Sequence, residues 1–383
     1  MLNALDIEQL GLFGGDLIDE DPNFLTRQVV TYIGNKRGLL SEISRGIEKV
    51  KSRLRKKKLR AFDVFSGSGV VSRLLKGHCS YLSCNDLENY SNILSHCYLT
   101  NRSTVDFREL GEIVLDLNAS VLHEGHEIGF IEELYAPRDE LNITKEDRVF
   151  YTRENARRID TYRKMIERYP PNIRTLLLGP LLSEASVHAN TAGVFKGFYK
   201  NRNTQIGQFG GTGSDALLRI LGKIELEVPV LSRFECEIDI RHGDSNEVAG
   251  KIKNLDLAYL DPPYNQHPYG SNYFMLNLIV DYIRPTEISG VSGIPSDWKR
   301  SAYNVRAKSF SSFKQLLESL DARFLLISFN NEGFISPEEM RDHLQTLGHL
   351  EVIEKQYNAF RGSRSFANRP IHVTEQLFIL ERK

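Results

Sequence analysis

Residues 59–86 read LRAFDVFSGSGVVSRLLKGHCSYLSCND, and the order of residue types in this stretch decides the expected fold. An apolar run over 59–65 is followed by a glycine-rich turn at 66–69, and an apolar face at helical spacing begins at Val70. A second apolar run over 80–84 is followed by Asp86. Strand, glycine-rich turn, helix, strand and acid in this order are typical of a βαβ unit that binds a nucleotide. The sequence therefore predicts an α/β fold.

Two glycines in the turn, Gly67 and Gly69, permit a close approach of the backbone to a ligand at the beginning of a helix. A helix N-terminus favours a carboxylate or a phosphate. The same pattern also fits a dinucleotide site. From its position alone, Asp86 is explained nearly as well by a loop or a helix cap as by binding of ribose hydroxyls. The turn therefore indicates a nucleotide-like cofactor without identifying it.

Further apolar runs supply the remaining strands. The runs at 238–240, 255–260 and 324–329 suit buried parallel strands. Two strand-like runs at 350–357 and 372–380 flank a basic loop and predict a terminal antiparallel hairpin. We therefore expect a mixed, mostly parallel sheet.

The segment 100–235 interrupts this pattern, because it is richer in helical periodicity and charge and shows no alternation of strands and helices. The sequence predicts a first part of an α/β domain at 25–99, an inserted and mainly helical domain at 100–235, and the second part of the α/β domain at 236–383.

Composition favours a soluble globular protein. Of the 383 residues, 41% are hydrophobic and 26% are charged. No run approaches the roughly 20 apolar residues of a membrane span. Residues 1–25 contain acidic residues and no Lys or Arg, unlike a secretory or transit signal. We therefore expect a cytoplasmic protein.

Cysteines and net charge exclude little by themselves. No CxxC pair occurs among the four cysteines, which are Cys79, Cys84, Cys97 and Cys236. Their spacings fit no common zinc module, so we expect free thiols and no metal site. The net charge of −1 does not indicate a nucleic-acid partner, and local basic clusters must carry that argument.

The run 256–264, DLAYLDPPY, predicts chemistry at a strand end. An apolar strand places Asp261 at its carboxyl end, where α/β folds bind ligands. The carboxylate of Asp261 and the carbonyl of Pro262 can accept both N–H groups of an amine on a flat ring, and Tyr264 can stack on that ring. Pro263 stiffens the turn further. A capping aspartate in a proline-stiffened turn is the plainer interpretation, but it leaves the glycine-rich turn upstream unexplained.

The glycine-rich turn and DPPY together resemble the DNA adenine-N6 methyltransferases. The order, in which the FxGxG motif comes before a target-recognition region and DPPY, resembles that of their α group. Further runs that resemble family motifs are TYIGNK at 31–36, DPPYNQHPYGSNYFMLN at 261–277, ISFNNEG at 327–333, FRGSR at 360–364 and NTAGVF at 190–195.

This resemblance implies a Rossmann-like fold that depends on S-adenosylmethionine and carries an inserted target-recognition domain. It implies direct methyl transfer to N6 of an adenine flipped out of double-stranded DNA. The catalytic residues it implies are Asp261, Pro262, Pro263 and Tyr264. The cofactor residues it implies are Tyr32, Asn35, Lys36, Asp63, Phe65, Ser66, Gly67, Gly69, Asp86, Asp244 and Asp261. Asp86 would hold the ribose and Asp244 would face the adenine of the cofactor, although Asp244 fits a turn residue equally well.

Three clusters are candidates for DNA contacts: 183–213, 361–369 and the basic run 49–60. Amides and arginines are the groups that read base edges. The side chains singled out are Asn190, Lys196, Lys200, Arg202, Asn203, Arg361 and Arg364. A glycine-rich loop at 210–213 is a further candidate for a phosphate. For 49–60 a solvated face of the helix expected over 38–50 is about as good an explanation.

Other substrates and roles stay open. Enzymes that methylate cytosine N4 usually carry Ser at the position of Asp261, so Asp261 favours adenine, and it counts against the Asn-Pro-Pro-Tyr motif of protein glutamine methylation. RNA adenine is a further candidate substrate. A non-catalytic DNA-specificity subunit on the same fold is the alternative from another class, although the intact Lys36, Gly67 and Asp261 argue against it. The sequence also leaves open whether a cognate restriction endonuclease exists.

Overall fold

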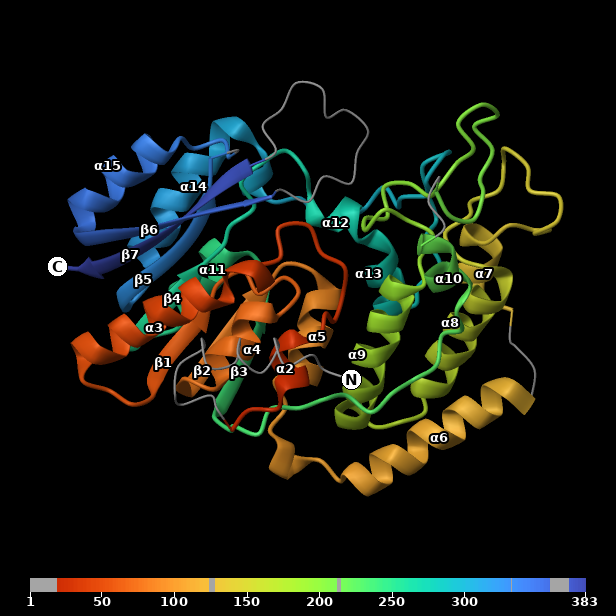
Figure 1. Cartoon of the computed structure of the whole chain (residues 1–383), viewed down its shortest axis with the longest axis horizontal. Helices are drawn as coiled ribbons and strands as arrows, with labels where there is room; N and C mark the ends of the chain where they lie inside the picture. Colours follow the sequence, from red (N-terminus) through yellow and green to blue (C-terminus); the bar gives the residue numbers. More distant parts are fainter. Residues whose placement is uncertain (1–18, 124–127, 212–214, 332, 359–371) are drawn as a thin grey trace.

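A seven-stranded mixed sheet forms the centre of the α/β part, in the order β3-β2-β1-β4-β5-β7-β6 (Figure 1). The computed structural model describes residues 19–123, 128–211, 215–331, 333–358 and 372–383. The strands are β1 (Leu59–Asp63), β2 (Cys79–Asp86), β3 (Glu237–His242), β4 (Leu255–Leu260), β5 (Ala322–Asn330), β6 (Gly348–Asn358) and β7 (His372–Arg382). Strands β1 to β5 run parallel, and β7 is antiparallel to β5 and β6. The predicted mostly parallel sheet with a terminal hairpin is confirmed.

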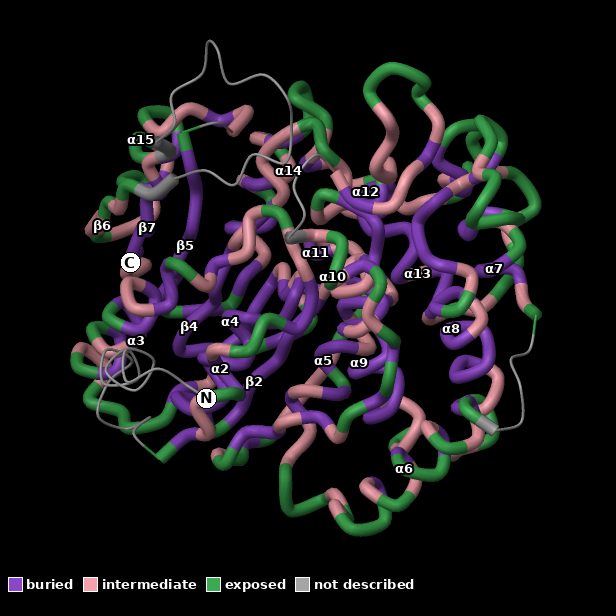
Figure 2. Tube along the Cα trace, turned by 45° about the vertical axis from the view of Figure 1, so that its right-hand side comes forward, coloured by how far each residue is buried: buried purple, intermediate pink, exposed green. Residues whose placement is uncertain are grey.

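Helices cover both faces of the sheet, because successive side chains along a strand point to opposite faces. On β4, Leu257 and Tyr259 belong to the core under α3 and α4, whereas Ala258 and Leu260 belong to the core under α11, α14 and α15. These helices are α3 (Leu40–Leu54), α4 (Val70–Lys76), α11 (Ser245–Ala249), α14 (Arg306–Ser319) and α15 (Pro337–Leu347). Figure 2 shows the buried residues following the strands between these helices.

The predicted βαβ unit is present as β1, α4 and β2. Gly69 has a positive φ of 74° and stands as the N-cap of α4, so the chain turns sharply from the strand into the helix. Leu74 and Leu75 are fully buried under the sheet. Local signals of periodicity and turn chemistry were sufficient to predict this unit.

The described residues of segment 100–235 form five α-helices, the short 3-10 helix η3 (Arg102–Thr104) and no strand, apart from an isolated bridge between Lys200 and Gly207. The helices are α6 (Phe107–His123), α7 (Phe130–Tyr135), α8 (Arg153–Ile166), α9 (Pro171–Val187) and α10 (Asp215–Leu221). In Figure 1 they lie to one side of the sheet. No helix among the described residues is both long and apolar enough to cross a membrane.

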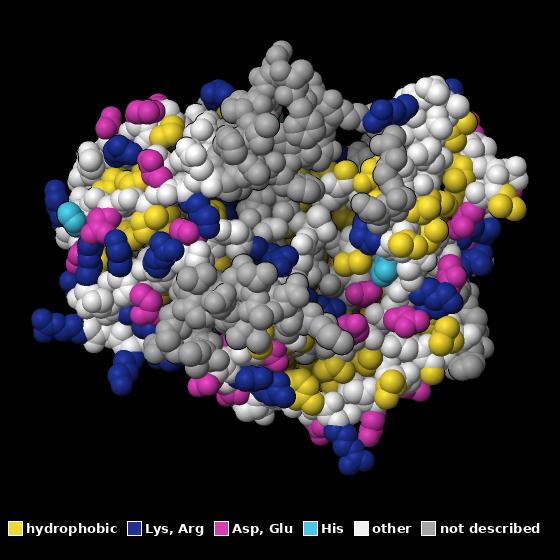
Figure 3. Space-filling view, in the orientation of Figure 1, with side chains coloured by type: hydrophobic (Ala, Val, Ile, Leu, Met, Phe, Trp, Pro, Cys, Tyr) yellow, Lys and Arg dark blue, Asp and Glu magenta, His cyan; other side chains and the backbone are white. Residues whose placement is uncertain are grey.

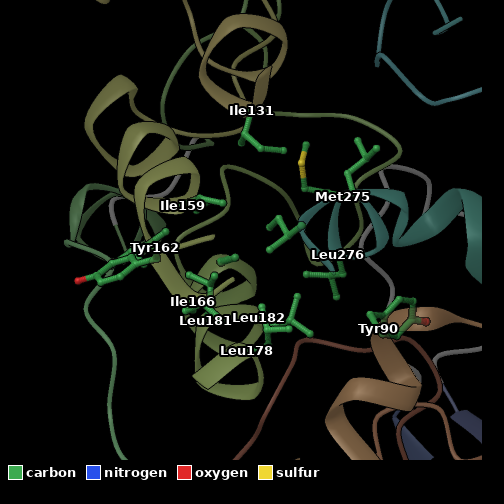
Figure 4. Close-up of a cluster of buried hydrophobic side chains, with 14 of the residues drawn as sticks. Tyr90, Ile131, Ile159, Tyr162, Ile166, Leu178, Leu181, Leu182, Met275 and Leu276 are labelled. Atoms are coloured by element: carbon green, nitrogen blue, oxygen red, sulfur yellow. The ribbon is translucent and has the colours of Figure 1, made fainter. Parts of the chain in front are cut away.

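The core of these helices includes residues from outside 100–235. Figure 4 shows Leu178, Leu181 and Leu182 of α9 beside Met275 and Leu276. The two latter residues belong to α13 (Phe274–Asp281), which follows α12 (Tyr269–Asn272) and the DPPY turn. The chain on the carboxyl side of the DPPY turn therefore joins the core of the helical segment, which links the end of β4 to that segment.

Candidate active site

An open cavity lies at the carboxyl ends of β1, β2 and β4. The strand order continues from β1 toward β2 on one side and toward β4 on the other, so the sheet reverses its winding between β1 and β4. Ligands of open α/β sheets bind at such a reversal. Asp63 ends β1, and Asp261 directly follows β4, so one carboxylate stands on each side of the reversal.

Most of the residues expected at a cofactor site line this one cavity. They are Tyr32, Asn35, Lys36, Asp63, Phe65, Ser66, Gly67, Asp86, Asp244 and Asp261, and Pro263 lines it with them. Gly69, Pro262 and Tyr264 are not among the lining residues. The structure thus brings together side chains from the first and second parts of the α/β fold.

The glycine turn and the acid at the end of β2 are joined directly. The N–H of Gly67 donates a hydrogen bond of 2.7 Å to Asp86, and the N–H of Glu88 donates one of 2.9 Å to the same carboxylate. Burial raises the pKa of Asp86 above its ordinary value. Gly67 has a φ of 52°, and a Cβ at this position would stand 3.1 Å from the ring of Tyr32. Asp86 therefore holds the turn in shape while it lines the cavity.

Asp244 is a helix cap that also lies in the cavity wall. Its side chain caps α11 by accepting a 2.9 Å hydrogen bond from the N–H of Asn246, and it also lines the cavity. Asp63 is 1% exposed and accepts a 2.6 Å hydrogen bond from Ser72. Burial raises the pKa of Asp63 to about 7, and the negative charges of Asp261 and Asp86 act in the same direction.

A stack of three tyrosines ties the N-terminal motif to the segment after DPPY. The nearly parallel rings of Tyr32, Tyr269 and Tyr273 lie against one another. Their centroids are 5.0 Å apart for Tyr32 and Tyr269, 4.7 Å for Tyr32 and Tyr273, and 6.1 Å for Tyr269 and Tyr273. The hydroxyl of Tyr32 is 3.1 Å from that of Tyr90. The N–H of Ile33 donates a 2.7 Å hydrogen bond to Tyr273. These contacts hold residues 31–36 against the cavity.

Asp261 pairs with a buried lysine. The Nζ of Lys36 is 3.0 Å from Oδ1 of Asp261 and 3.1 Å from Oε1 of Glu375. Burial raises the pKa of Asp261 to about 6, although the Lys36 ammonium opposes this rise. Burial alone would lower the pKa of Lys36, but the Asp261 carboxylate and its neighbours raise it well above the ordinary value. The ammonium and the carboxylate thus face each other inside the cavity wall.

Tyr264 lies beside the cavity and contacts the region of the late motifs. Its ring meets Phe329 edge to face at 5.4 Å, and its carbonyl accepts a 2.8 Å hydrogen bond from the N–H of Phe334. The Nζ of Lys36 is 5.5 Å from the centroid of this ring. Pro262 is buried. The turn at 261–264 therefore packs against Phe329 and Phe334 beside the cavity.

Sequence reasoning missed several lining residues, chiefly Glu88, Tyr269, Lys299, Ser301 and Asn304. Lys299 and Ser301 precede η4 (Ala302–Asn304), and Asn304 is its last residue. This part of the sequence carries no recognisable motif. Only Tyr269 had a signal, its place in the aromatic segment after DPPY.

The structure contradicts the expectation that Asn190 contacts DNA. Asn190 is fully buried, its amide donates to the carbonyls of Val149 and Gln208, and its oxygen accepts from the N–H of Gly210. Its hydrogen-bonding groups are therefore used to join three loops. Sequence alone does not distinguish such an amide from a surface amide.

The other DNA candidates in this segment lie differently. Lys196, Arg202 and Asn203 are exposed, and Lys200 is half-buried with its Nζ 5.0 Å from the ring centroid of Phe198. Arg361 and Arg364 lie outside the described residues, as does 212–214 of the glycine-rich loop.

Part of the basic run 49–60 pairs with acidic neighbours. Lys49 pairs with Glu351 at 3.0 Å, and Lys56 pairs with Asp256 at 2.7 Å. Figure 3 shows basic and acidic side chains interspersed on the α/β part of the molecule. This arrangement favours the interpretation of 49–60 as a solvated face.

The chain resembles known DNA methyltransferases over most of its length. A model of the D12 class N6 adenine-specific DNA methyltransferase family matches residues 32–342. The type II methyltransferase M.NlaIII of Neisseria lactamica is 29% identical over 367 residues, which cover 92% of this chain and 99% of that protein. The type II methyltransferase M.CviAII of Paramecium bursaria Chlorella virus 1 is 29% identical over 360 residues, with coverages of 92% and 98%.

A third relative is longer than this chain. The modification methylase StsI of Streptococcus sanguinis is 27% identical over 367 residues, which cover 92% of this chain and 52% of that protein. With the matching motifs on one cavity at the reversal of the sheet, the chain belongs to the D12 class of N6 adenine-specific DNA methyltransferases.

Proposed function

We propose that this methyltransferase takes its methyl group from S-adenosylmethionine and transfers it to adenine N6 at specific sites in double-stranded DNA. The observation that carries the proposal is that Gly67 and Asp261, from the two expected motifs, line a single cavity. A methyl donor and an accepting amine must meet in line at short range, and a shared cavity supplies that proximity.

The lining residues fit a cationic cofactor that carries a nucleoside. Oδ1 of Asp63 is buried and has no hydrogen-bond partner among the described residues, so a ligand ammonium would satisfy it. Asp86 offers acceptors for ribose hydroxyls, and Gly67 leaves space that a Cβ would fill. Asp63, Asp86 and Asp244 would hold the cofactor together with Tyr32 and the glycine turn. When bound, S-adenosylmethionine supplies a methyl group that its sulfonium has already activated.

Asp261 and Pro262 would orient the target amine. An adenine amine is a weak nucleophile because its lone pair is delocalised into the ring. Hydrogen bonds from its two N–H groups to the Asp261 carboxylate and the Pro262 carbonyl favour a tetrahedral nitrogen whose lone pair points at the methyl group. Direct transfer requires no covalent enzyme intermediate. Accordingly, all four cysteines are buried, and burial raises the pKa of each thiol.

The adenine must leave the duplex to reach Asp261. Flipping a base costs a few kcal/mol, and stacking on an aromatic side chain returns about 1–3 kcal/mol. Tyr264 would provide that stacking surface, supported from the side by Phe329. The half-buried and exposed side chains Lys196, Lys200, Arg202 and Asn203 would contact DNA from the segment 100–235, which we propose as the target-recognition domain. Arg361 and Arg364 stay in the proposal on sequence grounds.

The names of the relatives support a place in a restriction-modification system. M.NlaIII and M.CviAII are named type II methyltransferases, and StsI is named a modification methylase. We propose that this chain protects DNA from a cognate restriction endonuclease in the cytoplasm of its host.

Mapping modified bases tests the proposal. The protein is expressed in a host without DNA methylation, and the genome is read by long-read sequencing that distinguishes N6-methyladenine from N4-methylcytosine. We expect N6-methyladenine at one short sequence in the wild type and none in the variant Asp261→Ala. The exposed control Asp297→Ala should match the wild type. Modified cytosine, or modified adenine in the Asp261→Ala variant, would refute the assignment.

A titration separates catalysis from a purely DNA-binding role. Wild type and Asp261→Ala are titrated calorimetrically with S-adenosylmethionine. We expect both to bind, because Asp261 acts on the amine. If the protein binds DNA but releases or absorbs no heat with S-adenosylmethionine, it is a non-catalytic specificity subunit. In a separate methylation assay, methylation of RNA in place of DNA would support the RNA alternative.

A further inference from the structure

Glu375 on β7 is a buried carboxylate next to the proposed catalytic aspartate. It is 2% exposed, and carboxylates are rarely so buried unless they are paired. Its Oε1 lies 3.1 Å from Nζ of Lys36 and accepts a 2.6 Å hydrogen bond from Ser328 on β5. Because β7 pairs with β5 in antiparallel register, Glu375 lies opposite Asn330, near the carboxyl end of β5. The terminal hairpin thus brings an acid to the same edge of the sheet as Asp261.

The Lys36 ammonium has three N–H donors and three oxygens around it. These oxygens belong to Gly34 at 3.2 Å, Asp261 at 3.0 Å and Glu375 at 3.1 Å. Lys36 is itself 2% exposed, so water does not replace these partners. The ammonium therefore occupies a defined position in which its charge is divided between two carboxylates.

Dividing this charge affects the reaction that we propose. In a site poor in water, a Lys36 ammonium that paired with Asp261 alone would form a stronger charge-assisted hydrogen bond with the Asp261 carboxylate. A carboxylate engaged in that way is a poorer acceptor for the N–H of an adenine amine. We propose that Glu375 is a positioning residue that shares Lys36 with Asp261 and thereby keeps Asp261 available to accept the target amine. This inference rests on the proposed role of Asp261.

The charged and titratable groups around Asp261 come from five parts of the fold. They are Lys36 before η2 (Arg37–Leu39), Asp63 on β1, Tyr259 and Tyr264 at the end of β4, Tyr269 on α12 and Glu375 on β7. The negative charge of Glu375 raises the pKa of Asp261. Removal of that charge should lower this pKa, because Lys36 then acts on Asp261 alone.

The variant Glu375→Gln tests the inference, since Gln keeps the size of the side chain and can still accept from Ser328. We expect kcat to fall at least tenfold, while the Kd for S-adenosylmethionine changes by less than twofold. We also expect the acidic limb of the kcat/KM profile against pH to move to lower pH. The matched control is Glu381→Gln on the same strand, where Glu381 pairs with Arg323 at the surface. Its rate and profile should equal those of the wild type.

If Glu375 had only a structural role, Glu375→Gln would lower activity without moving the acidic limb to lower pH. An acidic limb that stays in place or moves to higher pH therefore overturns the inference. A wild-type rate in Glu375→Gln also overturns it. If Glu375→Gln does not fold, Ser328→Ala is measured in its place, because it releases Glu375 from β5 while it retains both charges. Loss of that hydrogen bond strengthens the Glu375–Lys36 pair, so the acidic limb should then move to higher pH. No movement in Ser328→Ala would also overturn the inference. If Asp261→Ala remains active, the proposed function has failed instead.

Discussion

The backbone N–H of Gly67 donates a 2.7 Å hydrogen bond to the carboxylate of Asp86, which joins the first glycine turn of the fold to the end of the neighbouring strand. Two elements that are separate motifs in the sequence therefore act as one support for a ligand. Any change in Asp86 should alter the shape of the turn as well as the chemistry of the cavity.

The first prediction concerns this pair. Asp86→Ala removes the acceptor of two backbone N–H groups, from Gly67 and Glu88, so the turn should lose its shape. We expect the Kd for S-adenosylmethionine to rise at least tenfold, measured by calorimetric titration. Asp86→Asn keeps one acceptor oxygen and should lose less affinity. An unchanged Kd in both variants would remove Asp86 from the proposed cofactor site.

The second prediction concerns the pH dependence of stability. Burial raises the pKa of Asp63 to about 7, whereas the ordinary value is 3.8. A carboxyl group whose folded pKa is raised binds its proton more tightly in the folded state. Stability is therefore lost as pH rises from about 4 to about 7. Asp63→Asn removes this loss, so its Tm without cofactor should exceed that of the wild type by more at pH 8 than at pH 5.

Two measurements check this prediction. Thermal unfolding at both pH values should show no gain for Asp342→Asn, which lies on an exposed position of α15. Asp63→Asn should also bind S-adenosylmethionine more weakly, because an amide offers the ligand ammonium no negative charge. Equal Tm gains at pH 5 and pH 8 would contradict the raised pKa.

The third prediction concerns DNA contacts. Replacement of Lys196, Lys200 and Arg202 by Ala should weaken DNA binding and reduce the magnitude of the slope of log K against log salt, by up to about 3 if each contacts one phosphate. Fluorescence anisotropy over a salt series measures the slope. The control replaces Arg55, Lys56 and Lys57, which removes the same charge from the solvated face at 49–60. A slope that changes only in the control would reverse the two assignments.

The fourth prediction concerns the tyrosine stack. Tyr32→Phe keeps the ring that packs against Tyr269 and Tyr273 and removes the hydroxyl contact with Tyr90, so the KM for S-adenosylmethionine should change by less than about threefold. Tyr32→Ala removes the ring that holds the N-terminal motif against the cavity. Its KM should rise at least tenfold in steady-state assays. Similar values for the two variants would show that stacking is not what positions residues 31–36.

Much of the fold was predictable because its signals are local. Periodicity and turn residues predicted the βαβ unit at 59–86 and the terminal hairpin, and Gly69 begins α4 with the positive φ that a glycine permits. The two motifs predicted strand ends that line one cavity in the structure. The prediction for Asn190 rested only on its being a polar residue. A sequence does not distinguish an amide that is hydrogen-bonded inside the protein from an amide that contacts DNA.

The sequence by itself determined the succession of β1, α4 and β2 along the chain, the class of chemistry and the positions of Gly67, Asp86 and Asp261, because these features belong to short motifs whose geometry is set by neighbouring residues. Only the tertiary structure decided which side chains from distant segments join them. Lys36 and Glu375 lie near opposite ends of the chain and meet 3.1 Å apart only because the sheet places β7 beside β5. Such pairing depends on strand order and register, which are properties of the whole sheet and leave no local pattern to read.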